Sequence, residues 1–345
     1  MTIRSNRSRR TAGRIALRTT AAICALASLT AMAGCDGPVP QMQATSTAAA
    51  KTPDLNVDQE AKIRASILDT LKKADDAKDP SQLAQSVEGP ALAVRTSQLT
   101  AAQGTGSLTK YATIPSDIEQ TVIPTDTGWP RSVFTITTTT EDRQTQRLLV
   151  MTQASAHRNY KLWGVVRLLA GAQLPKFAVP KIGASMGHPD DSGLVATPAD
   201  AVAHYADVLA NGTNSQYASA FADDDFRKTI ATTTATVQQG MEANRGTQSQ
   251  TFSAEPDAIS IMRSSDGGDL VVAQINSEWT RQAGEGRESL PASADETALF
   301  GGATPTSTLK VTYVNLVALY VPPASSGAQI QAVGAERQPV KVEAL

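Results

Sequence analysis

The most constraining feature of this sequence is a pattern of helical periodicity followed by strand alternation, which occurs twice along the chain. In the first half Asn56 and Gln59 form a potential N-cap pair, and in the second half Thr197 precedes Pro198 at an expected helix start. Apolar residues then recur at helical spacing, which predicts a buried face on each helix. These residues are Ile63, Ile67, Leu68 and Leu71 in the first half, and Val202, Tyr205, Ala206 and Leu209 in the second.

Strand-like runs follow the helices in each half. They cover residues 118–123, 132–140, 145–154 and 160–169 in the first half, and residues 258–263, 269–281, 308–321 and 329–335 in the second. Helices followed by a four-stranded antiparallel sheet, twice, predict an α+β fold. This element order resembles the NTF2-like and cystatin-like folds, in which helices cover one face of a curved sheet. The resemblance implies no particular activity, because one fold hosts many functions.

A short internal similarity indicates that the two halves arose by duplication. Residues 81–87 (Ser-Gln-Leu-Ala-Gln-Ser-Val) resemble residues 215–221 (Ser-Gln-Tyr-Ala-Ser-Ala-Phe), and a second helical stretch follows each segment. The segment 174–198 between the halves is rich in Pro and Gly, as linkers are. We therefore expect a first α+β domain at residues 57–187 and a second at residues 188–345.

A long irregular segment at residues 282–307 interrupts the strands of the second half. Segments of this length within a compact domain are usually functional or disordered. Ala298, Leu299 and Phe300 form an apolar island within it, which offers a docking point for a partner. The Gly, Ser, Ala, Glu and Pro content favours disorder over docking.

The N-terminal segment has the charge order of a secretory signal. Residues 1–34 carry six arginines and no acidic residue, and an apolar run of about 15 residues at 19–33 follows most of them. That run is too short for a stable membrane-spanning helix. Arg9 and Arg10 suggest twin-arginine export, but Ala12 and Gly13 stand where that signal has bulky apolar residues, so the general secretory route is favoured.

The end of this segment, Leu29-Thr30-Ala31-Met32-Ala33-Gly34-Cys35, resembles the lipobox of bacterial lipoproteins. The resemblance implies a diacylglyceryl group on Cys35, cleavage before it, and a chain held by lipid at the outer face of the cytoplasmic membrane. Residues 35–56 are then a lipidated, disordered tether. The alternative is ordinary cleavage after Ala33, which would release a soluble protein with Cys35 as an unpaired thiol. Cys24 lies within the signal, so the mature chain has no disulfide.

Charge and aromatic content argue against nucleic-acid binding. After removal of the signal, 25 basic residues remain against 33 acidic ones, a net charge of −8. A surface with this balance repels phosphate backbones. Trp129, Trp163 and Trp279 are the only tryptophans, too few for an extended platform on which bases stack.

Residues 183–187 (Gly-Ala-Ser-Met-Gly), followed by His188, fit the G-x-S-x-G pattern of α/β-hydrolases. That motif requires a buried strand, a tight turn and a helix. The flanking Pro180 and Pro189, and the position between the two halves, argue against such an arrangement. The expected role of this segment is a linker.

The other chemical candidates have simpler structural explanations. Asp223, Asp224 and Asp225 lack the pattern of a calcium loop and are expected to begin a helix, while His204 beside Tyr205 is expected at the edge of a buried helical face. Asp75, Asp76 and Asp79 are expected in a solvated turn, and Gly104 to Gly106 lack a phosphate-loop pattern. The three histidines, His157, His188 and His204, show no metal-ligand spacing. We therefore predict no catalytic, cofactor-binding or metal-ligating residue.

The chain as a whole resembles uncharacterised lipoproteins of high-GC Gram-positive bacteria, through its Arg-rich signal, its lipobox and the segment at residues 88–93 (Glu-Gly-Pro-Ala-Leu-Ala). The resemblance implies an extracytoplasmic, membrane-anchored protein and assigns no active-site residue. The expected role is a non-enzymatic binding or accessory module that engages an envelope protein, a wall polymer or a small ligand. The alternative is an envelope hydrolase or isomerase that uses carboxylates or His204 in a cavity of an α+β domain.

Overall fold

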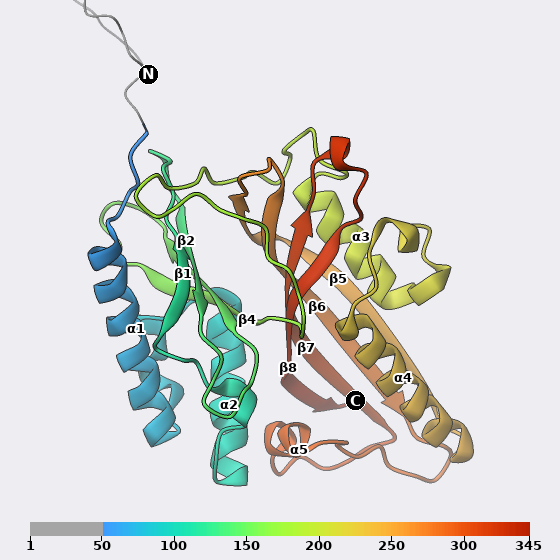
Figure 1. Ribbon diagram of the computed structural model, residues 1–345. Coiled ribbons are helices and arrows are strands. Elements are labelled where there is room, and N and C mark those ends of the chain that lie inside the picture. Colours follow the sequence, from blue (N-terminus) through green and yellow to red (C-terminus); the bar gives the residue numbers. More distant parts are fainter. Residues whose placement is uncertain (1–50) are drawn as a thin grey trace, which may run out of the picture. The chain divides into compact units, whose positions relative to one another are not determined.

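The computed structural model describes residues 51–345 (Figure 1). The predicted signal, Cys35 and most of the predicted tether lie outside this part of the chain. Within residues 51–345, no helix combines the length and apolar character needed to cross a membrane.

The first half contains two long helices followed by four strands. The helices are α1 (Val57–Ala77) and α2 (Gly89–Thr105), separated by the 3-10 helix η1 (Pro80–Gln85). The strands pair in chain order as an antiparallel meander. They are β1 (Ile118–Val122), β2 (Arg131–Thr137), β3 (Arg147–Gln153) and β4 (Lys161–Arg167).

The second half repeats this order with longer strands. Helices α3 (Pro198–Asn211) and α4 (Asp225–Ala243) flank the 3-10 helix η4 (Ala218–Ala220) and precede a second antiparallel meander. Its strands are β5 (Thr247–Arg263), β6 (Asp269–Gln282), β7 (Thr308–Val321) and β8 (Gln331–Ala344), with α5 (Ala294–Phe300) between β6 and β7. The α+β prediction, with two four-stranded antiparallel sheets each preceded by helices, is confirmed.

Both predicted helix starts are present. The Asn56 side chain accepts from the Gln59 amide and the Gln59 side chain accepts from the Asn56 amide, which completes the capping box of α1. Thr197 caps α3 through the Asp200 amide, and Pro198 occupies the first turn. The predicted apolar faces are directed inward. In the first half Ile67 and Leu71 are buried, and Ile63 and Leu68 pack against the core that contains them. In the second half the buried residues are Val202, Tyr205, Ala206 and Leu209.

The two sheets pack against each other and carry helices on their outer faces (Figure 1). Alternate residues of β2 show this division, since Val133 packs toward α1 and α2 whereas Phe134 packs toward the second sheet. Core residues of α3 and α4 cover the opposite face of the second sheet. The shared core between the sheets includes Val150, Val166, Leu270, Val272, Leu316 and Ala318.

Two close connections join the sheets. At one, Leu168 after β4 bridges Gly334 of β8. At the other, Ala184 bridges Pro124 after β1, and Met186 bridges Met262 of β5. Residues 184–186 of the connecting segment therefore lie between the edges of the two sheets.

The short similarity between residues 81–87 and 215–221 has a structural counterpart. Each segment forms a 3-10 turn, and each ends in a residue that makes an isolated parallel bridge: Val87 with Leu162, and Phe221 with Ile330. A long helix follows in both halves. The shared geometry supports the proposed duplication.

Two strand boundaries differ from the prediction by more than three residues. Strand β5 begins at Thr247 rather than at residue 258, and β8 continues to Ala344 rather than ending at residue 335. The start of β5 is almost entirely polar, so its alternation carries no hydrophobic signal, and its pairing with the end of β6 is what makes it a strand. Pro339 discourages a strand assignment, but β8 is an edge strand, where proline is tolerated.

Candidate functional site

The G-x-S-x-G segment is an extended connection between the sheets. Gly183 has a φ of +75°, and a Cβ there would lie 2.5 Å from Cγ2 of Thr125. The bridges at Ala184 and Met186 flank Ser185 on both sides, so no strand–turn–helix surrounds the serine. The segment has the structural role that its prolines predict.

The acidic run at residues 223–225 begins α4. Asp224 is the N-cap, and its carboxylate accepts from the amide and the Nε of Arg227 at 2.8 and 2.6 Å. The prediction that this run begins a helix is confirmed. Within residues 51–345, no three His, Cys, Asp or Glu side chains are grouped so that they could hold a metal ion.

His204 and Tyr205 lie at the edge and in the interior of the second core, as predicted. The His204 ring stacks on Tyr217 with ring centroids 3.6 Å apart. Tyr205 is fully buried, and burial together with the nearby Asp224 raises its pKa well above the usual 10. These contacts give both residues a packing role.

The prediction for Asp75 is wrong, whereas Asp76 and Asp79 are exposed. Asp75 contacts Nη2 of Arg95 at 2.5 Å and is partly buried. Burial raises its pKa, and the neighbouring guanidinium opposes that shift. The partner lies on the next helix, so helical spacing within α1 could not indicate the pair.

The expectation of disorder in residues 282–307 is also wrong for its central part. Ser293 caps α5, and Leu299 and Phe300 pack against Trp279, Leu309 and Val311 of the second sheet. The apolar island thus docks on the chain itself.

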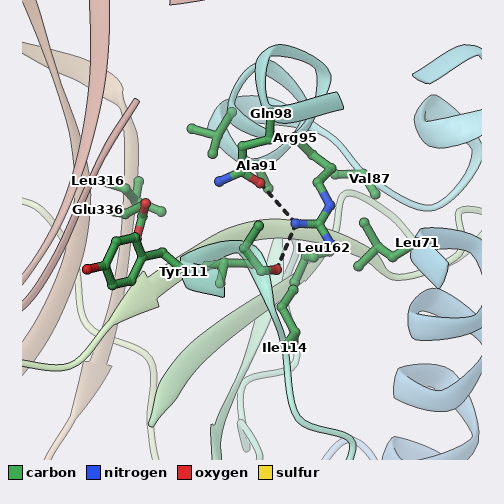
Figure 2. Close-up of a pocket in the computed structure, with 13 residues that line it drawn as sticks. Leu71, Val87, Ala91, Arg95, Gln98, Tyr111, Ile114, Leu162, Leu316 and Glu336 are labelled. Carbon is green, nitrogen blue, oxygen red and sulfur yellow. Dashed lines mark hydrogen bonds between the residues drawn. The ribbon is translucent and has the colours of Figure 1, made fainter. Parts of the chain in front are cut away.

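A small internal cavity of about 30 Å³ lies between α2, β4 and β8 (Figure 2). Arg95 lines it and donates to Gln98 Oε1 and to the carbonyl oxygen of Ala112, at 2.9 and 2.8 Å. Glu336 lines it too, and burial raises its pKa while Arg167, Arg147 and Arg95 oppose that shift. The volume suits one or two water molecules. This cavity is therefore too small for a ligand.

A much larger cleft of about 640 Å³ opens where β2 begins and β3 ends. We call it the inter-sheet cleft, because both sheets and the connecting segment line it. Its lining comprises residues 88, 126–130, 132, 152, 154, 163, 186–189, 257 and 259–261. The volume is in the range typical of ligand sites.

Hydrogen bonds hold several polar groups of the inter-sheet cleft in place. Glu88 accepts from the Thr152 hydroxyl at 2.5 Å, and Asp126 accepts from the amide of Met186 at 2.6 Å. The hydroxyls of Ser132 and Ser260 are 2.9 Å apart and join the two sheets. The carboxylates are thus oriented before any ligand arrives.

Two of the three tryptophans line this cleft. Trp129 is 43% exposed, its peptide bond to Pro130 is cis, and the Arg131 guanidinium lies 4.2 Å from its ring centroid. Trp163 packs against the shared core, and a Cβ on Gly89 would lie 2.7 Å from its ring. Gly89, which also has a φ of +55°, therefore gives Trp163 the room it occupies.

A cluster of titratable groups lies next to one wall of the cleft. Asp269 is fully buried and pairs with Nε of Arg263 at 2.8 Å, while Arg263 also contacts Asp191 at 2.5 Å. Burial raises the pKa of Asp269 to about 7, against the opposing effect of Arg263. A Cβ on Gly187, which lines the cleft, would lie 3.2 Å from the Asp269 carboxylate, so this group lies next to the connecting segment at the cleft wall.

Sequence reasoning did not identify this site. Residues 186–189 were weighed only in or beside the G-x-S-x-G pattern, and Trp129 and Trp163 only as a platform for bases. Glu88 and Trp163 come from one half and Asp257 and Ser260 from the other, so no local pattern connects them. The only feature of the sequence that could have indicated the cleft was the presence of two tryptophans within one half of an aromatic-poor chain.

The comparisons with known proteins identify a family without an assigned function. A family profile described as "Domain of unknown function (DUF8094)" matches residues 47–341, which includes both halves and the inter-sheet cleft. No curated protein and no solved structure matches the chain. Because the match extends over most of the sequence, the chain belongs to the DUF8094 family.

Proposed function

We propose that this chain is a binding or accessory module of the bacterial cell envelope and that the inter-sheet cleft is its binding site. The observation that carries this proposal is the convergence of two tryptophans and three carboxylates, from Glu88, Asp126 and Asp257, on one ligand-sized cleft. Aromatic side chains with a few oriented polar groups are typical of binding sites. Each half is further proposed to be a variant of the NTF2-like or cystatin-like layout.

The location is part of the same proposal. Cys35 carries a diacylglyceryl group, as in the lipoproteins of high-GC Gram-positive bacteria that the sequence resembles, and this group holds the protein at the outer face of the cytoplasmic membrane. The two acyl chains of such a group give stable attachment, whereas one chain gives reversible attachment. The support is the seven-residue lipobox at residues 29–35.

The anchor is tested by the intact mass and membrane fractionation of the wild-type chain beside a Cys35→Ala variant. We expect the diacyl mass on the wild type only, and release of the variant from the membrane. A wild-type chain that begins at Gly34 and fractionates as soluble would contradict the anchor but not the cleft.

The binding role is tested by crosslinking in intact cells, followed by purification of the adducts. Trp129→Ala is the cleft variant, and Tyr111→Ala is the matched control because Tyr111 is an equally exposed aromatic residue, at 45% against 43%, outside the cleft. We expect adducts that Trp129→Ala loses and Tyr111→Ala keeps. Equal adducts from both variants would show that the cleft is not the binding site.

The second candidate is an envelope hydrolase or isomerase. His188 lines the same cleft as Glu88, Asp126 and Asp257, so a proton donor and an acceptor could face one ligand. Turnover of a bound ligand that is lost in Glu88→Gln while binding persists would favour this candidate over the binding module.

A further inference from the structure

The lining of the inter-sheet cleft combines acceptors, hydroxyls and aromatic rings without a cationic side chain. Among the described residues that line it, none is Lys or Arg. A phosphorylated or otherwise anionic ligand would meet Glu88, Asp126 and Asp257, and the guanidinium of Arg131 beside Trp129 is already paired with Asp54 at 3.2 Å, which disfavours such a ligand.

The tryptophans supply the apolar part of the site. Arg131 lies against the ring of Trp129 and holds it in place, yet almost half of the side chain stays exposed. Flat aromatic surfaces that remain accessible suit ligands with a flat apolar face and polar edges. A sugar ring has this form, since its C–H groups gather on one face and its hydroxyls point outward.

The polar groups favour hydroxyls over an ammonium group as the occupant. Glu88 and Asp126 each already accept a hydrogen bond from the protein, which partly stabilises their negative charge. The Thr152 and Ser260 hydroxyls donate to Glu88 and to Ser132, so the Ser132 hydroxyl keeps its proton for another acceptor. A sugar hydroxyl can both accept and donate, whereas an ammonium group can only donate.

We propose that the inter-sheet cleft binds a neutral glycan of the cell wall. In this arrangement a sugar ring stacks on the exposed Trp129, and its hydroxyls donate to Glu88, Asp126 and Asp257. This inference rests on the proposed binding role of the cleft and names the ligand class. The volume of about 640 Å³ accommodates a short stretch of a polysaccharide, with Trp129 at the exposed rim.

The test is co-sedimentation of the full chain, as its host processes it, with protein-free cell wall from the same bacterium. Periodate-treated wall is the control, because periodate cleaves the vicinal diols of sugar rings. We expect binding to untreated wall only, at least tenfold weaker binding for Trp129→Ala, intermediate binding for Trp129→Phe, and wild-type binding for Tyr111→Ala. Circular dichroism of each variant verifies that it is folded.

Charge dependence separates the glycan from a cation. Glycan binding should change less than threefold between 50 and 500 mM NaCl, because hydrogen bonds from neutral hydroxyls are screened little by salt. If the chain binds no wall at either salt concentration but binds spermidine in a way that depends on Trp129, the glycan is not the ligand, although the cleft is still a binding site.

Other outcomes are also decisive. Wall binding that survives periodate or Trp129→Ala would overturn this proposal. Absence of wall binding, together with crosslinks in cells that still depend on Trp129, would overturn the glycan alone. Absence of both wall binding and Trp129-dependent crosslinks would overturn the proposed function as well.

Discussion

Glu296 is the residue whose loss should be most costly to stability among those of the 282–307 segment. Its carboxylate pairs with the buried Arg281 and accepts from the Tyr313 hydroxyl at 2.8 Å and the Ala292 amide at 2.7 Å. Burial, and then the same carboxylate, raise the pKa of Tyr313. One side chain thus connects α5 to two strands.

We expect Glu296→Ala to lower the free energy of unfolding by about 3–5 kcal/mol, because it leaves a buried guanidinium without a partner. Urea unfolding measures the change. The exposed Glu288→Ala on the same segment should stay within about 0.5 kcal/mol of the wild type. Equal stability of the two variants would show that the buried pair contributes nothing.

Asp269 makes stability depend on pH. Its folded pKa of about 7 lies above the ordinary 3.8, so between these values the folded chain holds a proton that the unfolded chain has lost. Its stabilising contribution is therefore complete below about pH 3.8 and is lost as the pH rises to about 7.

Asp269→Asn should abolish this dependence, because the amide does not titrate. Between pH 4 and 7, we expect the wild type to lose stability relative to the variant by up to about 1.4 kcal/mol per pH unit. Unfolding at a series of pH values measures the difference, with the exposed Asp190→Asn as the control. Parallel wild-type and variant curves would refute the assignment.

At the scale of elements, two glycines allow the strands to approach closely. A Cβ on Gly164 would lie 2.9 Å from Leu316 Cδ2 across the sheet interface, and one on Gly334 would lie 2.8 Å from Val166 Cγ1. Both contacts belong to the shared core between the sheets. The distance between the sheets therefore depends on the absence of side chains at these positions.

Gly164→Ala should destabilise the protein by about 1–3 kcal/mol, since an added methyl group overpacks the interface. Thermal and urea unfolding test this, with Gly302→Ala as the control because nothing lies within 4 Å of a Cβ there. An unchanged Gly164→Ala variant would mean that the sheets separate at little cost.

The elements that could be predicted from the sequence are those with local signals. Capping boxes act within a few residues, so Asn56 and Thr197 marked their helices correctly. The polar start of β5, by contrast, becomes a strand through pairing with β6, and α5 is held by apolar contacts with distant strands. Such contacts are absent from any local window of sequence.

At the scale of the whole molecule, the two halves share a core. The inner faces of both sheets contribute to it, and Ser97 of α2 donates to the carbonyl oxygen of Pro339 in β8 at 2.5 Å. The described residues, 51–345, form one compact unit. The division into domains at residues 57–187 and 188–345 stays a prediction that unfolding can test.

We expect a single cooperative transition for the two halves, because separating them would expose the shared apolar core. A Trp279→Phe variant leaves tryptophans only in the first half, and a Trp129→Phe, Trp163→Phe variant leaves one only in the second. In each variant the fluorescence midpoint should coincide with that from far-UV circular dichroism. Separate midpoints would indicate independent domains.

The sequence by itself determined the α+β class, the two meanders, the helix starts and the buried helical faces, because hydrophobic periodicity and capping act over short distances. It also carries the lipobox on which the proposed anchor rests. Only the tertiary structure decided how the sheets pack, why Asp75 and Glu296 are paired rather than solvated, and where the inter-sheet cleft lies. Those features depend on side chains that are far apart in the chain and meet only when the two sheets come together.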